Sequence, residues 1–209
     1  NTFAHLSSDP HIAALFNQGM AELTRLVSIE VARAYDFAGK RVMDVGGGYG
    51  QLLAEILTAF PTAAGILCDM EHAIPKARQQ FTARGLADRC QFVSGDFFTS
   101  VPAGADVYCL KSVIHDWNDE DSIRILEALR HVMTPKTRVL LIERVMPERV
   151  QTSPEDQVCA QSDLHMLVAL AAQERTQAEY EALFAAAGMK LLRPIRMPSG
   201  FQILEAGLS

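Results

Sequence analysis

Apolar residues in the first part of the chain recur at helical spacing. Between residues 9 and 37 they fall every three or four positions, which predicts an amphipathic helix. Asp9 followed by Pro10 is a helix start signal, because aspartate caps a helix and proline suits its first turn. Gly39 ends this helical region.

From there the pattern changes to short apolar, β-prone runs that alternate with helical patterns. The predicted strands cover residues 41–45, 64–68, 90–93, 106–110 and 138–142. The predicted helices cover residues 51–59, 74–83 and 121–132, and Asn118 has the position of a cap for the last of them. Such alternation predicts an α/β fold, with a parallel sheet covered by helices on both faces.

The last third of the chain departs from this alternation. Thr176 and Glu179 have the spacing of a capping box, which predicts a helix that ends near Gly188. Strand patterns at residues 190–193 and 201–205 are separated by a Pro-Ser-Gly turn, so we expect a hairpin and an antiparallel edge to the sheet. The polar residues 147–154 are expected to form a loop.

Composition narrows the class of protein. The 209 residues have a formal net charge of −6 and are 49% hydrophobic, which excludes a disordered chain. No apolar run approaches the roughly 18 residues of a membrane span. The acidic balance argues against a nucleic-acid partner. Three of the 4 cysteines lie in apolar runs, which predicts reduced, buried thiols. Because no signal peptide is recognisable, we expect a cytoplasmic protein.

The segment DVGGGYG, residues 44–50, is the strongest local signal for a binding site. It follows the first parallel strand and opens a helix, which is where doubly wound folds bind nucleotides. Glycine lets a ligand approach the backbone closely, and the helix N-terminus favours an anionic group. Gly46, Gly48 and Gly50 are spaced G-x-G-x-G, whereas the dinucleotide fingerprint requires a glycine where this chain has Gln51.

Two aspartates follow the next two strands. Asp69 lies about 20 residues after the glycine loop, where a carboxylate can accept both ribose hydroxyls, and Asp96 could accept from an adenine amino group. These features indicate a nucleoside-containing cofactor, either NAD(P) or S-adenosylmethionine, and the glycine spacing favours the latter. The alternative is that the glycines merely permit tight packing of strand on helix.

The fourth strand leads into LKSVIHDW, residues 110–117. Lys111 and His115 should therefore lie at the carboxyl edge of the sheet with the cofactor. Histidine suits proton removal near neutral pH, and Glu143 or Glu174 could hold an imidazole nitrogen. The alternatives are a structural histidine, solvated glutamates and, for Glu174, a partner of the helix dipole. His165, which we place on a helix facing the presumed pocket, is the nearest rival base.

Taken in order, the motifs of this chain resemble one enzyme family. They are similar to the motifs of the S-adenosylmethionine-dependent O-methyltransferases typified by plant caffeic acid O-methyltransferase. In chain order the motifs are FNQGM, DVGGGYG, CDMEHAI, SGDFF, LKSVIHDW, LLIERVMP, DLHML and ERT. Bacterial polyketide and phenazine O-methyltransferases and acetylserotonin O-methyltransferase belong to the same family. The resemblance covers essentially the whole chain. It implies a class I methyltransferase (Rossmann-like) fold, with a seven-stranded, mostly parallel sheet whose last strand is inserted antiparallel.

The resemblance also implies roles for individual residues. His115 falls on the catalytic base and Glu143 and Glu174 on the two acids that flank it. Met20 and Met166 match methionines that hold the acceptor ring, although Met is more often a core residue. Asp116 and Trp117 are interpreted as a turn residue and a packing indole. The positions that match cofactor-binding residues are Gly46, Gly48, Asp69, Asp96, Phe97 and Lys111.

The implied reaction transfers a methyl group from S-adenosylmethionine to a hydroxyl of a small aromatic acceptor, phenolic or polyketide-like. It leaves S-adenosylhomocysteine and uses no metal. Two alternatives are a relative that keeps the cofactor but has changed chemistry, such as a hydroxylase or decarboxylase, and a catalytically incompetent fragment. The retained histidine and glutamates argue against the first of these.

The resemblance divides the chain into two parts. Residues 1–38 form a helical segment that leads into an S-adenosylmethionine-binding catalytic domain at residues 39–209. Nothing in the sequence matches the N-terminal winged-helix region with which family members dimerise. A homodimer is therefore expected of a full-length relative and stays open for this chain. Without that region, we expect part of the helix at residues 12–31 to be exposed.

Overall fold

The computed structural model describes residues 10–209, apart from the side chains of residues 10, 12–14 and 16–23. A long helix, α2 (Pro10–Ala34), comes first, and its expected cap Asp9 lies outside the described residues. Strands and helices then alternate as predicted. These elements are β1 (Arg41–Val45), α3 (Gln51–Ala59), β2 (Ala64–Asp69), α4 (Ile74–Ala83), β3 (Cys90–Ser94), β4 (Val107–Lys111), α5 (Asp119–Val132) and β5 (Arg138–Met146).

The C-terminal part contains the predicted capped helix and hairpin, together with a helix for which the sequence analysis gave no bounds. The elements are α6 (Pro154–Leu170), β6 (Arg175–Thr176), α7 (Gln177–Ala186), β7 (Met189–Arg196) and β8 (Phe201–Leu208). Helix α6 follows the predicted loop and exposes Leu164, Leu167 and Val168, at 61, 60 and 85%. Because its apolar side chains do not form one buried stripe, periodicity does not reveal this helix.

The main strand order is β3-β2-β1-β4-β5-β8-β7, and the short β6 pairs with β5. Strands β1 to β5 are parallel to one another, whereas β8 is antiparallel to both β5 and β7. The predicted mostly parallel α/β fold is confirmed, and so are the antiparallel hairpin at the edge of the sheet and the antiparallel last strand that the resemblance implies. The hairpin partner β7 takes the edge, so that β8 is inserted beside β5 and buries Ile203 and Leu204.

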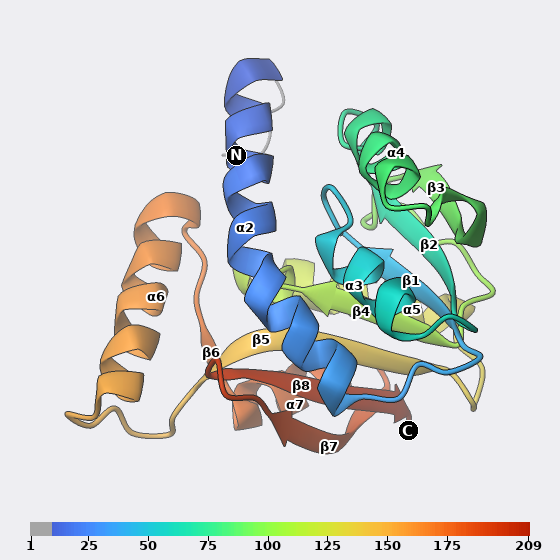
Figure 1. The fold of residues 1–209 in the computed structure, drawn as a ribbon. Helices are drawn as coiled ribbons and strands as arrows, with labels where there is room; N and C mark the ends of the chain where they lie inside the picture. Colours follow the sequence, from blue (N-terminus) through green and yellow to red (C-terminus); the bar gives the residue numbers. More distant parts are fainter. Residues whose placement is uncertain (1–9) are drawn as a thin grey trace.

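Helices cover both faces of the sheet because successive strand residues point to opposite sides. In β4, Val107 and Cys109 pack with apolar residues of α2, α3 and α4, while Tyr108 and Leu110 pack with those of α5 and α7. Figure 1 shows α2 crossing one face and extending beyond the sheet, and α6 standing to one side. On α2, Val27 and Val31 are buried whereas Leu15 and Leu26 are exposed.

The remaining composition-based expectations concern cysteines and membranes. Cys68, Cys90, Cys109 and Cys159 are all buried and carry free thiols, which was predicted for the three that lie in apolar runs. Among the described helices, none combines the length and apolar character that crossing a bilayer requires.

Candidate functional site

The glycine loop connects β1 to α3 at the carboxyl edge of the sheet. Gly46 and Gly48 have φ angles of 69° and 58°, in the left-handed region that favours glycine. A Cβ atom at Gly46 would lie 3.1 Å from Val113 Cγ2 and 3.6 Å from Phe97 Cε1. The loop therefore lies directly against both the segment that follows β3 and the segment that follows β4.

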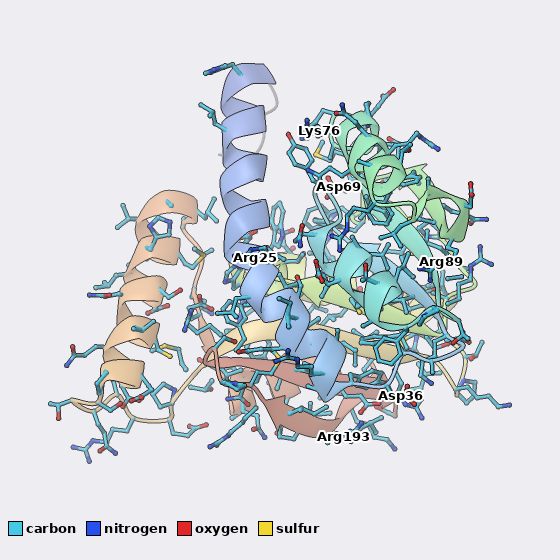
Figure 2. All side chains as sticks on the ribbon, in the orientation of Figure 1. Arg25, Asp36, Asp69, Lys76, Arg89 and Arg193 are labelled. Atoms are coloured by element: carbon cyan, nitrogen blue, oxygen red, sulfur yellow. The ribbon has the colours of Figure 1, made fainter. Side chains whose placement is uncertain are left out.

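Asp69 is anchored to this loop by its carboxylate. The Gly48 amide donates to Oδ2 at 2.7 Å, and the Met70 amide donates to Oδ1 at 2.7 Å. Burial raises the pKa of Asp69, while these two backbone bonds oppose the rise. Figure 2 shows Asp69 and Arg89 at opposite ends of the strands, because Asp69 ends β2 and Arg89 precedes β3. The predicted cofactor carboxylate thus contacts the predicted cofactor loop.

Asp44 was given no role from the sequence although it begins the glycine motif. Its side chain is buried, and Oδ2 has no hydrogen-bond partner among the described residues. Burial and the nearby Asp69 raise the pKa of Asp44 to about 7. A Cβ atom at Gly47 would lie 2.5 Å from Asp44 Oδ2, so glycine is required there by the carboxylate beneath it. Which side chain lies under the loop is a tertiary property that the motif does not reveal.

The other predicted cofactor residues lie near the same edge, with different surroundings. Asp96 is exposed and accepts a hydrogen bond from the Phe98 amide at 2.9 Å. Phe97 is half-buried, with its ring centroid 6.0 Å from that of Trp117 in an edge-to-face contact. Trp117 is thus a packing indole, as interpreted from the sequence.

Lys111, at the end of β4, connects the sheet to the first helix. Its Nζ atom donates to Thr24 Oγ1 of α2 at 2.9 Å. Burial lowers the pKa of Lys111, whereas Glu143 and Asp44 oppose that shift. The ammonium group therefore lies within the electrostatic reach of both the glycine loop and the histidine site.

His115 lies in a short 3-10 turn, η2 (Ile114–Asp116), directly after β4. Its Nδ1 atom is 3.2 Å from Glu174 Oε1 and 3.7 Å from Glu143 Oε2, while Nε2 is 3.4 Å from Asp116 Oδ1. His115, Glu143 and Glu174 are only 8, 0 and 5% exposed. The three predicted residues thus come together, and the sequence interpretation of Asp116 as a turn residue missed its carboxylate beside the ring.

The two glutamates are held by hydrogen bonds that orient them toward the imidazole. Glu143, on β5, accepts from the amides of Val113 and Ile114 at 3.1 and 3.0 Å through Oε1. Glu174 Oε1 accepts from Ser162 Oγ of α6 at 2.6 Å. The other oxygen of each carboxylate is buried without a hydrogen-bond partner among the described residues. The negative charge of both carboxylates can therefore interact with the imidazole ring.

The carboxylates change the acid-base properties of His115. Burial by itself would lower the pKa of His115, but Glu143, Glu174 and Asp116 outweigh it and raise that pKa to about 9. Burial raises the pKa of Glu143 to about 7 and that of Asp116 to about 6, in each case against the opposing charge of His115. The site is a buried, strongly coupled cluster in which the imidazole is an unusually strong base.

The donor atoms of His115, Glu143 and Glu174 all lie within 4.8 Å of one another, a spacing that a metal site can also have. The Nδ1 atom is already engaged with Glu174 at 3.2 Å, and Glu143 Oε1 is engaged with two amides. The arrangement therefore suits proton transfer, with Nδ1 held by Glu174 and Nε2 facing the Asp116 carboxylate at 3.4 Å.

The backbone before His115 makes an unusual turn. Ser112 has a φ angle of 53°, in the left-handed region that non-glycine residues rarely adopt. Its amide donates to the Ile142 carbonyl at 3.0 Å, which extends the pairing of β4 with β5 by one residue. The chain then bends sharply into η2. Serine carries no signal for this conformation, so the sequence does not predict it.

The predicted acceptor residues and the rival base lie on α2 and α6. Met166 is half-buried on α6, one helical turn after Ser162, so it shares the helix face that contacts Glu174. Met20 belongs to α2, but its side chain lies outside the described residues. His165 lies on a helix, as expected, and is exposed.

Comparison with known proteins identifies the family of this chain. The family model of the O-methyltransferase domain matches residues 1–190. A phenazine O-methyltransferase, PhzM of Lysobacter antibioticus, is 43% identical over 98% of this chain and 59% of its own length. A mitomycin biosynthesis 6-O-methyltransferase of Streptomyces lavendulae is 39% identical over 92% of this chain and 54% of its own.

A solved structure extends the comparison to bound ligands. The O-methyltransferase NcsB1 from neocarzinostatin biosynthesis, in complex with S-adenosylmethionine and 2-hydroxy-5-methyl naphthoic acid, superposes with a TM-score of 0.90 and 33% identity. The match covers 99% of this chain and 61% of that one. The chain thus spans little more than half the length of the curated relatives it matches. On the strength of the family model and these relatives, the chain belongs to the O-methyltransferase domain family.

Proposed function

We propose that this chain transfers a methyl group from S-adenosylmethionine to a hydroxyl of a small aromatic acceptor, with residues 39–209 as its catalytic domain. The observation that carries the proposal is the position of His115. Its imidazole is held between buried Glu174 and Glu143, at 3.2 and 3.7 Å, directly after the strand that adjoins the glycine loop.

The glycine loop and its surroundings fit the cofactor. Gly46 and Gly48 have no side chains and left-handed backbone angles, and Asp69 offers a carboxylate at the end of the next strand. Asp96 and Phe97 are proposed to contact the adenine, and Lys111 to add a positive charge at the same edge. S-adenosylmethionine, when bound, supplies an electrophilic methyl group on a positively charged sulfur. Related structures contain S-adenosylmethionine or its demethylated product.

His115 is proposed to act as the general base. Glu174 holds Nδ1, so Nε2 is the nitrogen that takes the acceptor's hydroxyl proton. A phenol has a pKa near 10, and the pKa of His115 is about 9, so proton transfer between them is nearly balanced. An alkyl alcohol, with a much higher pKa, would transfer its proton to this imidazole far less readily. The site therefore favours a phenolic hydroxyl.

Glu143 and Glu174 are proposed to orient the imidazole and to stabilise the imidazolium after proton transfer. Both carboxylates are buried, so their attraction for the charged ring is weakly screened. Ser162 keeps Glu174 in place from α6, and two backbone amides keep Glu143 in place. Since neither glutamate rotates freely, the ring is pre-organised for the reaction.

The acceptor is proposed to be a flat, hydroxylated ring lying against Met166 and Met20. The relatives support this class, because their names refer to a phenazine, to mitomycin biosynthesis and to a dihydroxylated naphthoate. A homodimer for a full-length relative, with the state of this chain left open, and a cytoplasmic location are part of the same proposal.

The test compares wild-type protein with His115→Gln, using labelled S-adenosylmethionine and a panel of phenols, with cofactor binding followed by calorimetry. We expect the variant to bind the cofactor and to lose methyl transfer by about 100-fold or more, as typical for loss of a general base. His131→Gln, at an exposed histidine on α5, is the matched control and should retain activity. Full turnover in His115→Gln would remove the base assignment. Binding of NADH in place of S-adenosylmethionine would overturn the whole scheme.

A further inference from the structure

Arg175 is a fully buried arginine beside the site, and the proposed chemistry does not use it. It is 0% exposed and follows Glu174 in the chain. Its Nε and Nη2 atoms donate to Asp119 Oδ1 at 3.0 and 2.8 Å. Its Nη1 atom donates to the Ile114 carbonyl at 3.1 Å, and Nη2 also donates to the Trp117 carbonyl at 2.8 Å. The guanidinium thus binds three acceptors on the segment that carries His115.

These contacts enclose the histidine turn. Ile114 and Trp117 lie immediately before His115 and immediately after Asp116, so the guanidinium joins the two ends of η2. The Gln173 amide donates to the His115 carbonyl at 3.3 Å. Residues 173–175 therefore contact the η2 turn in two ways. Gln173 and Arg175 bind its backbone, and Glu174 contacts the His115 imidazole ring.

A purely structural role does not explain the choice of arginine. Burying a charge is costly unless the charge is paired, and the only carboxylate bonded to Arg175 among the described residues is Asp119, which is 66% exposed in its side chain. An apolar residue could fill the same volume without that cost. What arginine adds is a planar fork of donors that fixes several acceptors at defined angles, which lysine cannot reproduce.

We propose that Arg175 is a positioning residue for His115: its guanidinium holds the η2 turn so that the imidazole meets Glu174 and Glu143 at the observed distances. The guanidinium fixes the carbonyl groups of Ile114 and Trp117, and these carbonyls fix the backbone of the η2 turn. The backbone in turn fixes the orientation of the imidazole ring. The kinetic part of this inference rests on the proposed function of His115.

The test uses the whole 209-residue chain with Arg175→Lys, which keeps the charge but loses the fork. Arg193→Lys, at an arginine 60% exposed in its side chain and paired with Glu205 on the far hairpin, is the matched control. The readouts are kcat and KM with a phenolic acceptor, cofactor Kd by calorimetry, and NMR titration of the His115 imidazole, assigned by its loss in His115→Gln.

For Arg175→Lys we expect kcat to fall about 10- to 100-fold, because small misplacements of a catalytic group have effects of this size. Cofactor Kd should stay within about twofold of wild type, and the pKa of His115 should fall toward its ordinary value near 6.5 as the ring leaves its carboxylates. Arg193→Lys should change none of these. A wild-type kcat together with a wild-type His115 titration in Arg175→Lys would overturn the inference.

A second variant covers the case in which Arg175→Lys does not fold. Asp119→Ala removes an exposed side chain that receives two of the guanidinium's bonds, so it should fold and shift the His115 titration in the same direction by a smaller amount. An unshifted titration in this variant would contradict the inference. If His115→Gln is fully active, the base assignment fails, while the titration still decides whether Arg175 positions the ring.

Discussion

At the scale of single residues, His115 shows how neighbours determine chemistry. The same imidazole on an exposed surface would have a pKa near 6.5. Three carboxylates within 3.7 Å reverse the effect of burial and raise that pKa to about 9. The histidine and both glutamates could be named from their motifs, but Asp116 could not, because its contact depends on the local path of the η2 turn.

The raised pKa predicts an alkaline pH optimum. His115 must be neutral to accept a proton, so the active fraction should increase about tenfold for each pH unit below 9. We expect kcat/KM to rise steeply between pH 7 and 9 and to level off above that. His115→Gln should lose this dependence and show only the ionisation of the acceptor. A wild-type profile that is flat from pH 7 to 9 would contradict the prediction.

We expect Asp69 to contribute to cofactor binding rather than to proton transfer. Asp69→Ala removes the carboxylate that accepts from Gly48 and Met70 and is proposed to hold the ribose. We expect S-adenosylmethionine to bind about 10- to 100-fold more weakly, the value of one or two hydrogen bonds to a charged group. Calorimetry measures this directly. Asp88→Ala, at an exposed aspartate before β3, should leave the affinity unchanged. Equal affinity in Asp69→Ala would exclude the ribose assignment.

At the scale of elements, the capping box of α7 links helix stability to the site. Thr176 Oγ1 accepts from the Glu179 amide, and Glu179 Oε2 accepts from the Thr176 amide at 2.7 Å. Thr176 follows directly after Glu174 and Arg175. This cap was predicted from spacing alone, because its two partners are only three residues apart.

Thr176→Ala should destabilise the protein by about 1 kcal/mol, the usual effect of losing an N-cap. Denaturant unfolding followed by circular dichroism measures the change. Thr176→Ser keeps the hydroxyl and should retain most of the stability. If Thr176→Ser is as unstable as Thr176→Ala, packing of the methyl group rather than the cap holds the helix.

The helices and strands also show which structural features sequence patterns predict and which they do not. The bounds of β1, α3 and α4 agree with their predictions, since each has strong periodicity and clear glycine or proline borders. The hairpin spacing alone left the place of β8 open, whereas the resemblance implied an inserted last strand, which the structure contains. Hairpin spacing says that β7 and β8 pair, but it does not say which of them faces β5.

At the scale of the whole molecule, the buried acids and His115 make stability depend on pH. The pKa values of Asp44, Asp116 and Glu143 are raised to about 7, 6 and 7, and that of His115 to about 9. Each of these groups keeps its proton in the folded protein at a pH where the unfolded chain has lost it. Stability therefore falls as pH rises through these values.

We accordingly expect the unfolding temperature to be at least about 4 °C lower at pH 9 than at pH 6, which corresponds to roughly 1–2 kcal/mol for a chain of this size. Thermal scans across this range test the prediction. Glu127→Gln, on the exposed side of α5, should keep the same slope. An unfolding temperature that rises toward pH 9 would contradict the assignment of these buried groups.

The sequence by itself determined the features that depend on neighbours along the chain. Periodicity defined most strands and helices, and ordered motifs identified the glycine loop, Asp69 and His115 with Glu143 and Glu174. The tertiary structure alone decided which atoms meet: Asp116 and Arg175 around the histidine turn, Asp44 beneath Gly47, and Lys111 against α2. The reason is physical. Local patterns arise from backbone geometry over a few residues, whereas these contacts join segments that become adjacent only when the sheet and its helices pack.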